Sequence, residues 1–200
     1  MTLQASKQLS SAEALTIARI VRVNHAGEFG AIRIYSAQIS VATRLYPEIV
    51  PALATMLGHE KIHCAMFLAA MPGRNARPCR VMSFWSWGGW WLGLFTALMG
   101  RQAIWICTAA VEAAVHRHLD DQLHFLDGCD PGLAAIILSI REEELAHLRH
   151  AEEHIETRDA GARLLHGLIT FATDAVIWLS TWGDSTRMAR ALRAAPRLLH

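Results

Sequence analysis

Charged residues are scarce in this chain of 200 residues, since only 18% are Asp, Glu, Lys or Arg, against roughly 25% in an average soluble domain. Neither sign dominates, because 19 basic residues face 18 acidic ones, and bulk charge therefore gives no reason to expect nucleic acid as a partner. The apolar fraction is 52%, which excludes a disordered chain. The composition leaves open where so much apolar surface is placed.

The chain also lacks several features of other protein classes. Residues 1–10 contain no apolar run, so they predict neither a secretory signal nor a transit peptide. The four cysteines form no Cys-x-x-Cys pair, and we expect reduced thiols in an intracellular protein. No long linker rich in Gly, Ser or Pro divides the sequence. We therefore expect a single domain over 1–200, with a flexible N-terminus over 1–10 and an Arg-rich C-terminal tail over 183–200.

Strand patterns are absent too, because apolar and polar residues do not alternate along the chain. Stretches rich in Ala, Leu, Ile, Glu and Arg favour helices instead. They predict helices over 12–43, 48–71, 84–126, 131–158 and 161–182, with a short one over 185–195. Ser10 and Glu13 have capping-box spacing, and Asp130 before Pro131 is typical of a helix start. Long helices joined by short breaks predict an all-α fold, an antiparallel four-helix bundle.

The surplus of apolar residues gathers in two places. Residues 81–100 carry no charge, and all seven tryptophans lie in or just after this run or in the helix over 161–182. Because Trp prefers the membrane–water interface, a helix lying in one leaflet is favoured over a buried core helix or a full span. We therefore add to the bundle a hydrophobic membrane-docking helix at the C-terminus. The tail arginines, which share one helical face, predict either a solvated surface or a contact with anionic lipid: Arg187, Arg190, Arg193 and Arg197.

Glutamate and histidine recur in a regular pattern. The sequence contains two Glu-x-x-His pairs, and this spacing places a carboxylate and an imidazole on one helix face. A further glutamate lies 32 residues before each pair. The whole set repeats with an offset of 84 residues, as Glu28, Glu60 and His63 and then Glu112, Glu144 and His147. Four glutamates and two histidines that point into a bundle are the ligand set of ferritin-like di-iron proteins.

The neighbours of Glu28 and Glu112 favour a buried metal site. Both lie among small or apolar residues, where an unpaired carboxylate would cost several kcal/mol and a metal ion would supply the compensating charge. Glu143, by contrast, has the pattern of an ordinary solvated helix charge. Gly27 and Gly30 each lower helix stability, and we interpret them as sites of close helix approach beside Glu28.

Four segments together make the pattern more specific. They are Asn-His-Ala-Gly-Glu-Phe-Gly-Ala over 24–31 followed by Arg-Ile-Tyr over 33–35, Glu-Lys-Ile-His over 60–63, Cys-Thr-Ala-Ala-Val-Glu over 107–112 and Glu-Glu-Glu-Leu-Ala-His over 142–147. In this order, across about 15–182, they resemble the demethoxyubiquinone hydroxylase family. The chain departs from the family at Leu119, where a tyrosine is common, and in continuing past residue 180.

The resemblance implies a di-iron monooxygenase that inserts one oxygen atom from O2 into the ring of a polyprenyl methoxybenzoquinol in ubiquinone biosynthesis. It implies two iron ions, Fe2+ in the resting reduced state, with NADH or another electron donor. Carried over by motif, the ligands that hold the iron and through it catalyse the reaction are Glu28, Glu60, His63, Glu112, Glu144 and His147. Among them we expect Glu60 and Glu144 to bridge the two ions, with Glu28 and Glu112 as terminal ligands.

The expected setting is a peripheral membrane protein on the cytoplasmic face of a bacterial inner membrane. Its partners would be the quinol and the membrane surface, and partner proteins of ubiquinone biosynthesis and a homo-oligomer stay open. Two other ferritin-like functions also stay open. A tRNA hydroxylase needs a basic face, whereas the net charge is +1, and an iron-storage or peroxide-scavenging protein needs a soluble exterior, which the tryptophans over 85–91 would disturb.

Overall fold

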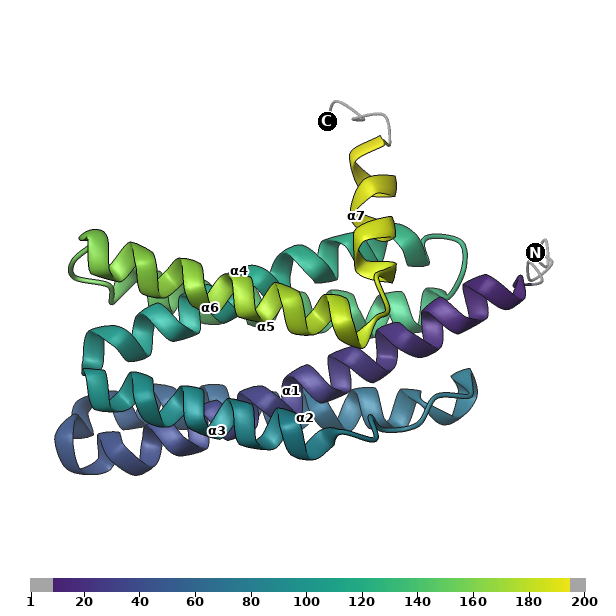
Figure 1. Cartoon of the computed structure of the whole chain (residues 1–200). Helices are drawn as coiled ribbons and strands as arrows, with labels where there is room; N and C mark the ends of the chain where they lie inside the picture. The colour runs from purple at the N-terminus through teal and green to yellow at the C-terminus, as the bar shows by residue number, and fades with distance from the viewer. Residues whose placement is uncertain (1–8, 195–200) are drawn as a thin grey trace.

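A computed structural model describes residues 9–194 of the chain (Figure 1). Most of the segment expected to be flexible, and Arg197 of the tail, lie outside the described residues. Within them the chain forms helices and no strand, which confirms the all-α prediction. The α-helices are α1 (Ser11–Leu45), α2 (Val50–Ala70), α3 (Met82–Met99), α4 (Arg101–Leu126), α5 (Pro131–Glu153), α6 (Ala160–Ser180) and α7 (Asp184–Ala194).

The predicted helix starts are confirmed where a capping residue marks them. The Ser10 hydroxyl accepts a hydrogen bond from the Glu13 backbone N–H, and the Glu13 carboxylate accepts one from the Ser10 N–H, as in a capping box. Asp130 accepts a hydrogen bond from the N–H of Leu133 at 2.9 Å, with Pro131 in the first turn of α5. Local sequence therefore determines where α1 and α5 begin.

Two predicted helix boundaries are wrong. The helix expected over 84–126 is two helices, because the chain turns at Gly100. The φ of Gly100 is 118°, a value that glycine adopts readily and that strains other residues. The helix expected over 131–158 ends at Glu153, and α6 begins only at Ala160. The turn at Gly100 sends α4 back along the molecule, so that it can pair with α5.

The molecule consists of two halves with the same order of helices. Helices α1, α2 and α3 lie together in the lower part of Figure 1, and α4, α5 and α6 lie together in the upper part. In each half the second and third helices pack on the first, and the halves meet through contacts of α2 with α5, α1 with α4 and α3 with α4. Helices α1, α2, α4 and α5 form the predicted four-helix bundle, with α3 and α6 added on its flanks.

The apolar core is divided into two main clusters. One contains Ile20 and Phe67 with residues of α4, α5 and α7, and the other contains Leu53 and Trp105. On each of the four bundle helices the predicted ligands lie between the residues of the two clusters. The polar site is therefore held between two packed apolar regions.

Helix α3 packs against α1 through its glycines. A Cβ atom on Gly89 would overlap the carbonyl oxygen of Gly30, and one on Gly93 would overlap that of Ile34. The close approach predicted at Gly30 is confirmed, whereas the prediction for Gly27 is wrong, because a Cβ atom there would meet open space. The outer face of α3 carries large exposed apolar side chains in one stripe: Phe84, Trp87, Trp91, Phe95 and Leu98.

Helix α6 also leaves most of its apolar surface exposed. Ile169 and Ile177 are buried, while a stripe on its outer face is exposed: Leu164, Leu168, Phe171 and Trp178, continued after the helix by Trp182. Among the described residues α6 alone is long and apolar enough to cross a membrane, judged by length and composition. The two flanking helices together account for much of the apolar surplus in the composition.

The last helix, α7, turns sharply away from α6 (Figure 1). Its buried Asp184 pairs with Arg19 of α1 at 2.9 Å and accepts a hydrogen bond from Thr16, while Met188 joins the core. Arg187, Arg190 and Arg193 remain exposed on the helix.

Candidate metal centre

The six predicted ligand residues come together in the middle of the bundle. Each of α1 and α4 supplies one glutamate, and each of α2 and α5 supplies a glutamate and a histidine at i and i+3. All six residues are buried, and none is more than 6% exposed. They form two overlapping groups, each with ligand atoms within 4.8 Å of one another: Glu28, Glu60, His63 and Glu144, and Glu60, Glu112, Glu144 and His147.

Glu60 and Glu144 belong to both groups, which is the arrangement expected of bridging carboxylates. Glu28 belongs only to the group of His63, and Glu112 only to the group of His147. The bridging roles expected for Glu60 and Glu144 therefore have a geometric counterpart in the fold.

Both histidines turn Nδ1 toward the carboxylates. Nδ1 of His63 lies 3.0 Å from Oε1 of Glu144 and 3.7 Å from Oε2 of Glu28. Nδ1 of His147 lies 3.4 Å from Oε1 of Glu60. These two nitrogens and Oε1 of Glu60 are buried and make no hydrogen bond. Three of the atoms that could bind an ion are thus buried without a hydrogen bond.

Four buried carboxylates in one place repel one another and favour protons. Burial raises the pKa of Glu28 and Glu60, and it raises that of Glu112 to about 8. The pKa of Glu144 is lowered, because contacts with Glu112 and both histidines outweigh its burial. The cluster without an ion therefore holds protons at neutral pH.

The pKa values of the two histidines shift in the opposite direction from those of ordinary buried histidines. Burial alone would lower the pKa of His63, but its contacts with Glu144 and Glu28 raise it to about 11. Contacts with Glu112, Glu144 and Glu60 likewise outweigh burial at His147 and raise its pKa to about 12. A divalent cation bound by these groups would replace the protons that now offset the negative charge.

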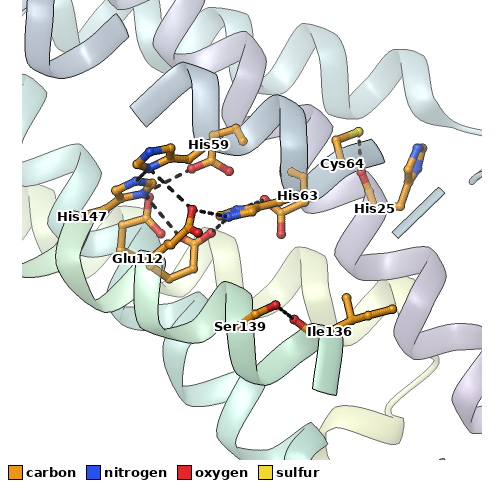
Figure 2. Close-up of polar contacts among 12 residues, drawn as sticks. His25, His59, His63, Cys64, Glu112, Ile136, Ser139 and His147 are labelled. Atoms are coloured by element: carbon orange, nitrogen blue, oxygen red, sulfur yellow. Dashed lines mark hydrogen bonds and ion pairs between the residues drawn. The ribbon is translucent and has the colours of Figure 1, made fainter. Parts of the chain in front are cut away.

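Three residues around the cluster were not predicted to have a role. The hydroxyl of Tyr35 donates a hydrogen bond to Oε1 of Glu112 at 2.9 Å. Nδ1 of His59 lies 2.9 Å from Nε2 of His147, and the two rings are nearly parallel (Figure 2). Glu143, interpreted from sequence as a solvated charge, lies with Oε2 only 3.1 Å from Nε2 of His63. The 84-residue repeat could have indicated that His59 and Glu143 lie beside the cluster, because it places them in equivalent positions next to a ligand.

An apolar cavity of about 400 Å³ reaches the cluster from one side. Glu28, Glu60, Glu112 and Glu144 form part of its wall, and most of the remainder comes from apolar side chains of α1, α3, α4 and α6. Its polar groups away from the carboxylates include two amides that bond each other, since Asn24 donates to Gln122 at 2.7 Å and accepts from it at 3.0 Å. His59 and Glu143 lie outside this lining, so the cavity and these two residues contact the cluster from different directions.

Comparison with known proteins gives consistent matches over most of the chain. The family model described as "Ubiquinone biosynthesis protein COQ7" matches residues 15–180. A protein from Dictyostelium discoideum named NADPH-dependent 3-demethoxyubiquinone 3-hydroxylase, mitochondrial, is 36% identical over 168 residues, which cover 82% of this chain and 76% of the relative. The 3-demethoxyubiquinol 3-hydroxylase of Rhodospirillum rubrum is 36% identical over 167 residues, covering 84% of this chain and 78% of the relative.

A more distant relative agrees with these two. The 5-demethoxyubiquinone hydroxylase, mitochondrial, of Saccharomyces cerevisiae is 30% identical over 191 residues, which cover 88% of this chain and 80% of that protein. Helix α7 follows the stretch matched by the family model, which ends at residue 180.

Proposed function

Because the chain belongs to the COQ7 family of ubiquinone biosynthesis proteins, we propose that it uses O2 to hydroxylate the ring of a polyprenylated demethoxyubiquinol. The observation that carries the proposal is the junction of an apolar cavity with a buried cluster of four carboxylates and two imidazoles. Neither a tRNA hydroxylase nor an iron-storage protein is favoured, because the matched relatives are named for quinone hydroxylation.

The donor set fits two iron ions. Carboxylate oxygens and imidazole nitrogens suit iron, whereas thiolate-rich sites select zinc. A ferritin-like bundle supplies this combination of carboxylates and imidazoles. Nδ1 of His63, Nδ1 of His147 and Oε1 of Glu60 support the fit, because they are buried without a hydrogen bond, which is costly for a polar atom. Glu28 and His63 would hold one ion, Glu112 and His147 the other, with Glu60 and Glu144 between them.

Bound iron would supply the electrons and the Lewis acidity that let O2 react with an aromatic ring. The protein has three tasks. Its carboxylates and imidazoles give up protons when cations bind, Tyr35 holds Glu112 in place through their hydrogen bond, and the cavity encloses the ring. The apolar walls exclude water from the reacting ring, which protects against side reactions.

The cavity also suits the apolar tail of the proposed substrate. Phe84 of α3, which is 75% exposed, and Val176 of α6, which is 40% exposed, both line it. The same two helices carry the exposed apolar stripes on their outer faces. A substrate dissolved in a membrane could therefore pass between α3 and α6 without crossing water.

We propose that these stripes bind a membrane surface, which in a bacterium would be the cytoplasmic face of the inner membrane. The exposed tryptophans on both helices support this, since Trp prefers the interface, and Arg187, Arg190 and Arg193 on α7 could contact anionic head groups. Flotation with vesicles tests it. Replacing Trp87 and Phe95 by serine should lower binding about tenfold or more.

Leu138→Ser is the matched control for membrane binding, because Leu138 is a 52% exposed residue on α5, away from both stripes. Binding that is unchanged in the double variant, or lowered equally by Leu138→Ser, would contradict the assignment. Anionic vesicles should bind more protein than neutral ones if the arginines of α7 take part, at about 1 kcal/mol for each contact.

Hydroxylation is tested with the iron-loaded chain, a demethoxyubiquinol with a short isoprenoid tail, and ¹⁸O₂. Mass spectrometry should find one labelled oxygen atom in the product. NADH and NADPH are supplied in parallel, because several relatives are named NADPH-dependent while the resemblance suggests NADH. Glu144→Ala should abolish the reaction and Glu142→Gln should preserve it. A Glu144→Ala protein that keeps both irons and full activity would contradict the proposal.

A further inference from the structure

Two residues with different chemistry occupy equivalent positions beside the cluster. His59 immediately precedes Glu60 in α2, and Glu143 immediately precedes Glu144 in α5. The two positions are 84 residues apart, the same offset that relates the ligands of the two halves. The repeat therefore preserves the metal ligands but places an imidazole in one half where the other half has a carboxylate.

Each of these residues contacts the histidine ligand of the opposite half. Oε2 of Glu143 lies 3.1 Å from Nε2 of His63, across the contact between α5 and α2. Nδ1 of His59 lies 2.9 Å from Nε2 of His147, with ring centroids 5.2 Å apart and rings only 7° from parallel. Figure 2 shows the rings of His59 and His147 side by side, with His63 nearby.

The orientation of each histidine ligand determines what its outer partner does. Since Nδ1 points toward the carboxylates, Nε2 carries the proton when Nδ1 binds an ion. Nε2–H of His63 then donates to the carboxylate of Glu143, and Nε2–H of His147 donates to Nδ1 of His59, which itself lies 3.7 Å from Oε2 of Glu143. A charged acceptor makes the stronger hydrogen bond and increases the basicity of the imidazole that binds the metal.

We propose that Glu143 and His59 are positioning residues that make the two metal positions unequal, so that the position of Glu28 and His63 binds its ion more tightly than that of Glu112 and His147. This inference rests on the proposed function, because it requires two ions in the cluster. Glu143 also adds negative charge near the first position, which increases its attraction for a cation.

Neither residue is a structural part of the core. The side chain of Glu143 is 50% exposed and that of His59 is 37% exposed. Neither lines the cavity, so substitution should change metal binding without altering the substrate pocket. Partners of this kind typically change metal affinity by about 10- to 100-fold when they are removed.

The test is an anaerobic titration of the metal-free full chain with Fe2+. Calorimetry and the near-infrared circular dichroism of the ferrous sites monitor the binding of each ion. The wild-type chain should bind two ions in two resolved steps. Glu143→Gln should weaken the tighter step by about 10- to 100-fold, and His59→Phe, which keeps an aromatic ring but removes the acceptor, should weaken the other step.

Two further variants sharpen the test. Glu142→Gln removes the same charge one residue away, where the carboxylate pairs with Arg141 at 3.2 Å, and should leave both steps nearly unchanged. His59→Glu gives both halves a carboxylate at the equivalent position, and should tighten the weaker step until the two steps merge. Thermal unfolding of each metal-free variant confirms that it folds as the wild-type chain does.

Three results would overturn the inference: two equivalent ions in the wild-type chain, the same effect from Glu143→Gln as from Glu142→Gln, or a loss in the same step from Glu143→Gln and His59→Phe. A wild-type chain that binds fewer than two ions would instead contradict the proposed function. The two failures are therefore distinguishable in one experiment.

Discussion

The first half of the molecule, α1 to α3, and the second half, α4 to α6, use the same plan with different supporting residues. Each half supplies one glutamate and one Glu-x-x-His pair to the cluster, and each ends in a flanking helix with an exposed apolar stripe. The differences lie around these shared features. Positions 84 residues apart hold Tyr35 and Leu119, His59 and Glu143, and Gly93 and Ile177.

These differences separate two levels of constraint. The ligands repeat because an ion requires the same donor atoms on both sides of a shared pair of carboxylates. The surrounding residues are free to differ, and they do: Tyr35 donates to Glu112, whereas the buried side chain at the equivalent Leu119 has no polar group to offer Glu28. The two halves are therefore alike in the atoms that bind and unlike in the atoms that support them.

The largest expected effect is the loss of iron when a ligand shared by both groups is removed, compared with removal of a ligand that belongs to one group. Glu60→Ala should remove a carboxylate from both groups, abolish binding of the ion pair and lower hydroxylation by more than about 100-fold, since loss of an outer partner alone costs up to that amount. Glu28→Ala should lose one ion and keep the other. Iron analysis after anaerobic loading measures this, and equal losses in the two variants would contradict the shared role of Glu60.

A smaller effect is expected from the contrast between the flanking helices. Gly93→Ala on α3 should destabilise the protein by about 1–3 kcal/mol or more, because its Cβ atom would overlap the backbone of Ile34. Gly167→Ala on α6 meets open space and should stabilise the protein by about 0.5–1 kcal/mol through helix propensity. Urea unfolding measures both. Similar changes in the two variants would show that α3 and α6 are packed alike.

Sequence reasoning found the parts of this structure that are encoded locally. The capping residues of α1 and α5 and the spacing of the six ligands follow from patterns within one helix or from a simple repeat. The turn at Gly100 was missed, because glycine occurs several times in that apolar run and only one of these glycines adopts a positive φ. Gly89 and Gly93 remain helical and pack on α1, whereas the helix ends at Gly100.

The supporting residues were harder to predict because their partners lie on other helices. Tyr35 is one of many side chains on α1, and its role depends on α4 being opposite. Glu143 follows another glutamate and is half exposed, so its sequence context alone indicates a solvated charge. Its contact with His63 arises only when α5 packs on α2. Contacts between helices, rather than patterns within them, determine these roles.

A further prediction concerns Tyr35, which supports only the second half of the cluster. Tyr35→Phe should weaken the ion of Glu112 and His147 by about tenfold and leave the ion of Glu28 and His63 nearly unchanged. Tyr46→Phe is the matched control, since Tyr46 lies at the end of α1 beside Gly100. Anaerobic Fe2+ titration measures both, and an equal loss in both steps would contradict a role limited to one half.

The last prediction concerns the pH dependence of the metal-free protein. The pKa of Glu112 is raised from 4.5 to about 8, so its contribution to stability is complete below pH 4.5 and is lost as the pH rises through 8. The pKa of His63 is raised from 6.5 to about 11, and its contribution is lost on the way to that pH. Both halves therefore lose stability as the pH rises from 6.5 to 9.

Thermal unfolding across this range measures the loss. The melting temperature of the metal-free chain should fall with rising pH, and that of the iron-loaded chain should fall less, because cations replace the protons. Glu112→Gln should flatten part of the decline. A metal-free chain that becomes more stable between pH 6.5 and 9 would contradict the protonation of the cluster.

The most direct test of two halves that share one metal centre is a crystal structure of the iron-loaded chain with anomalous scattering recorded at the iron edge. We predict two iron peaks, one beside Glu28 and His63 and one beside Glu112 and His147, with carboxylates of Glu60 and Glu144 between them. A single peak, or peaks outside this cluster, would contradict the account.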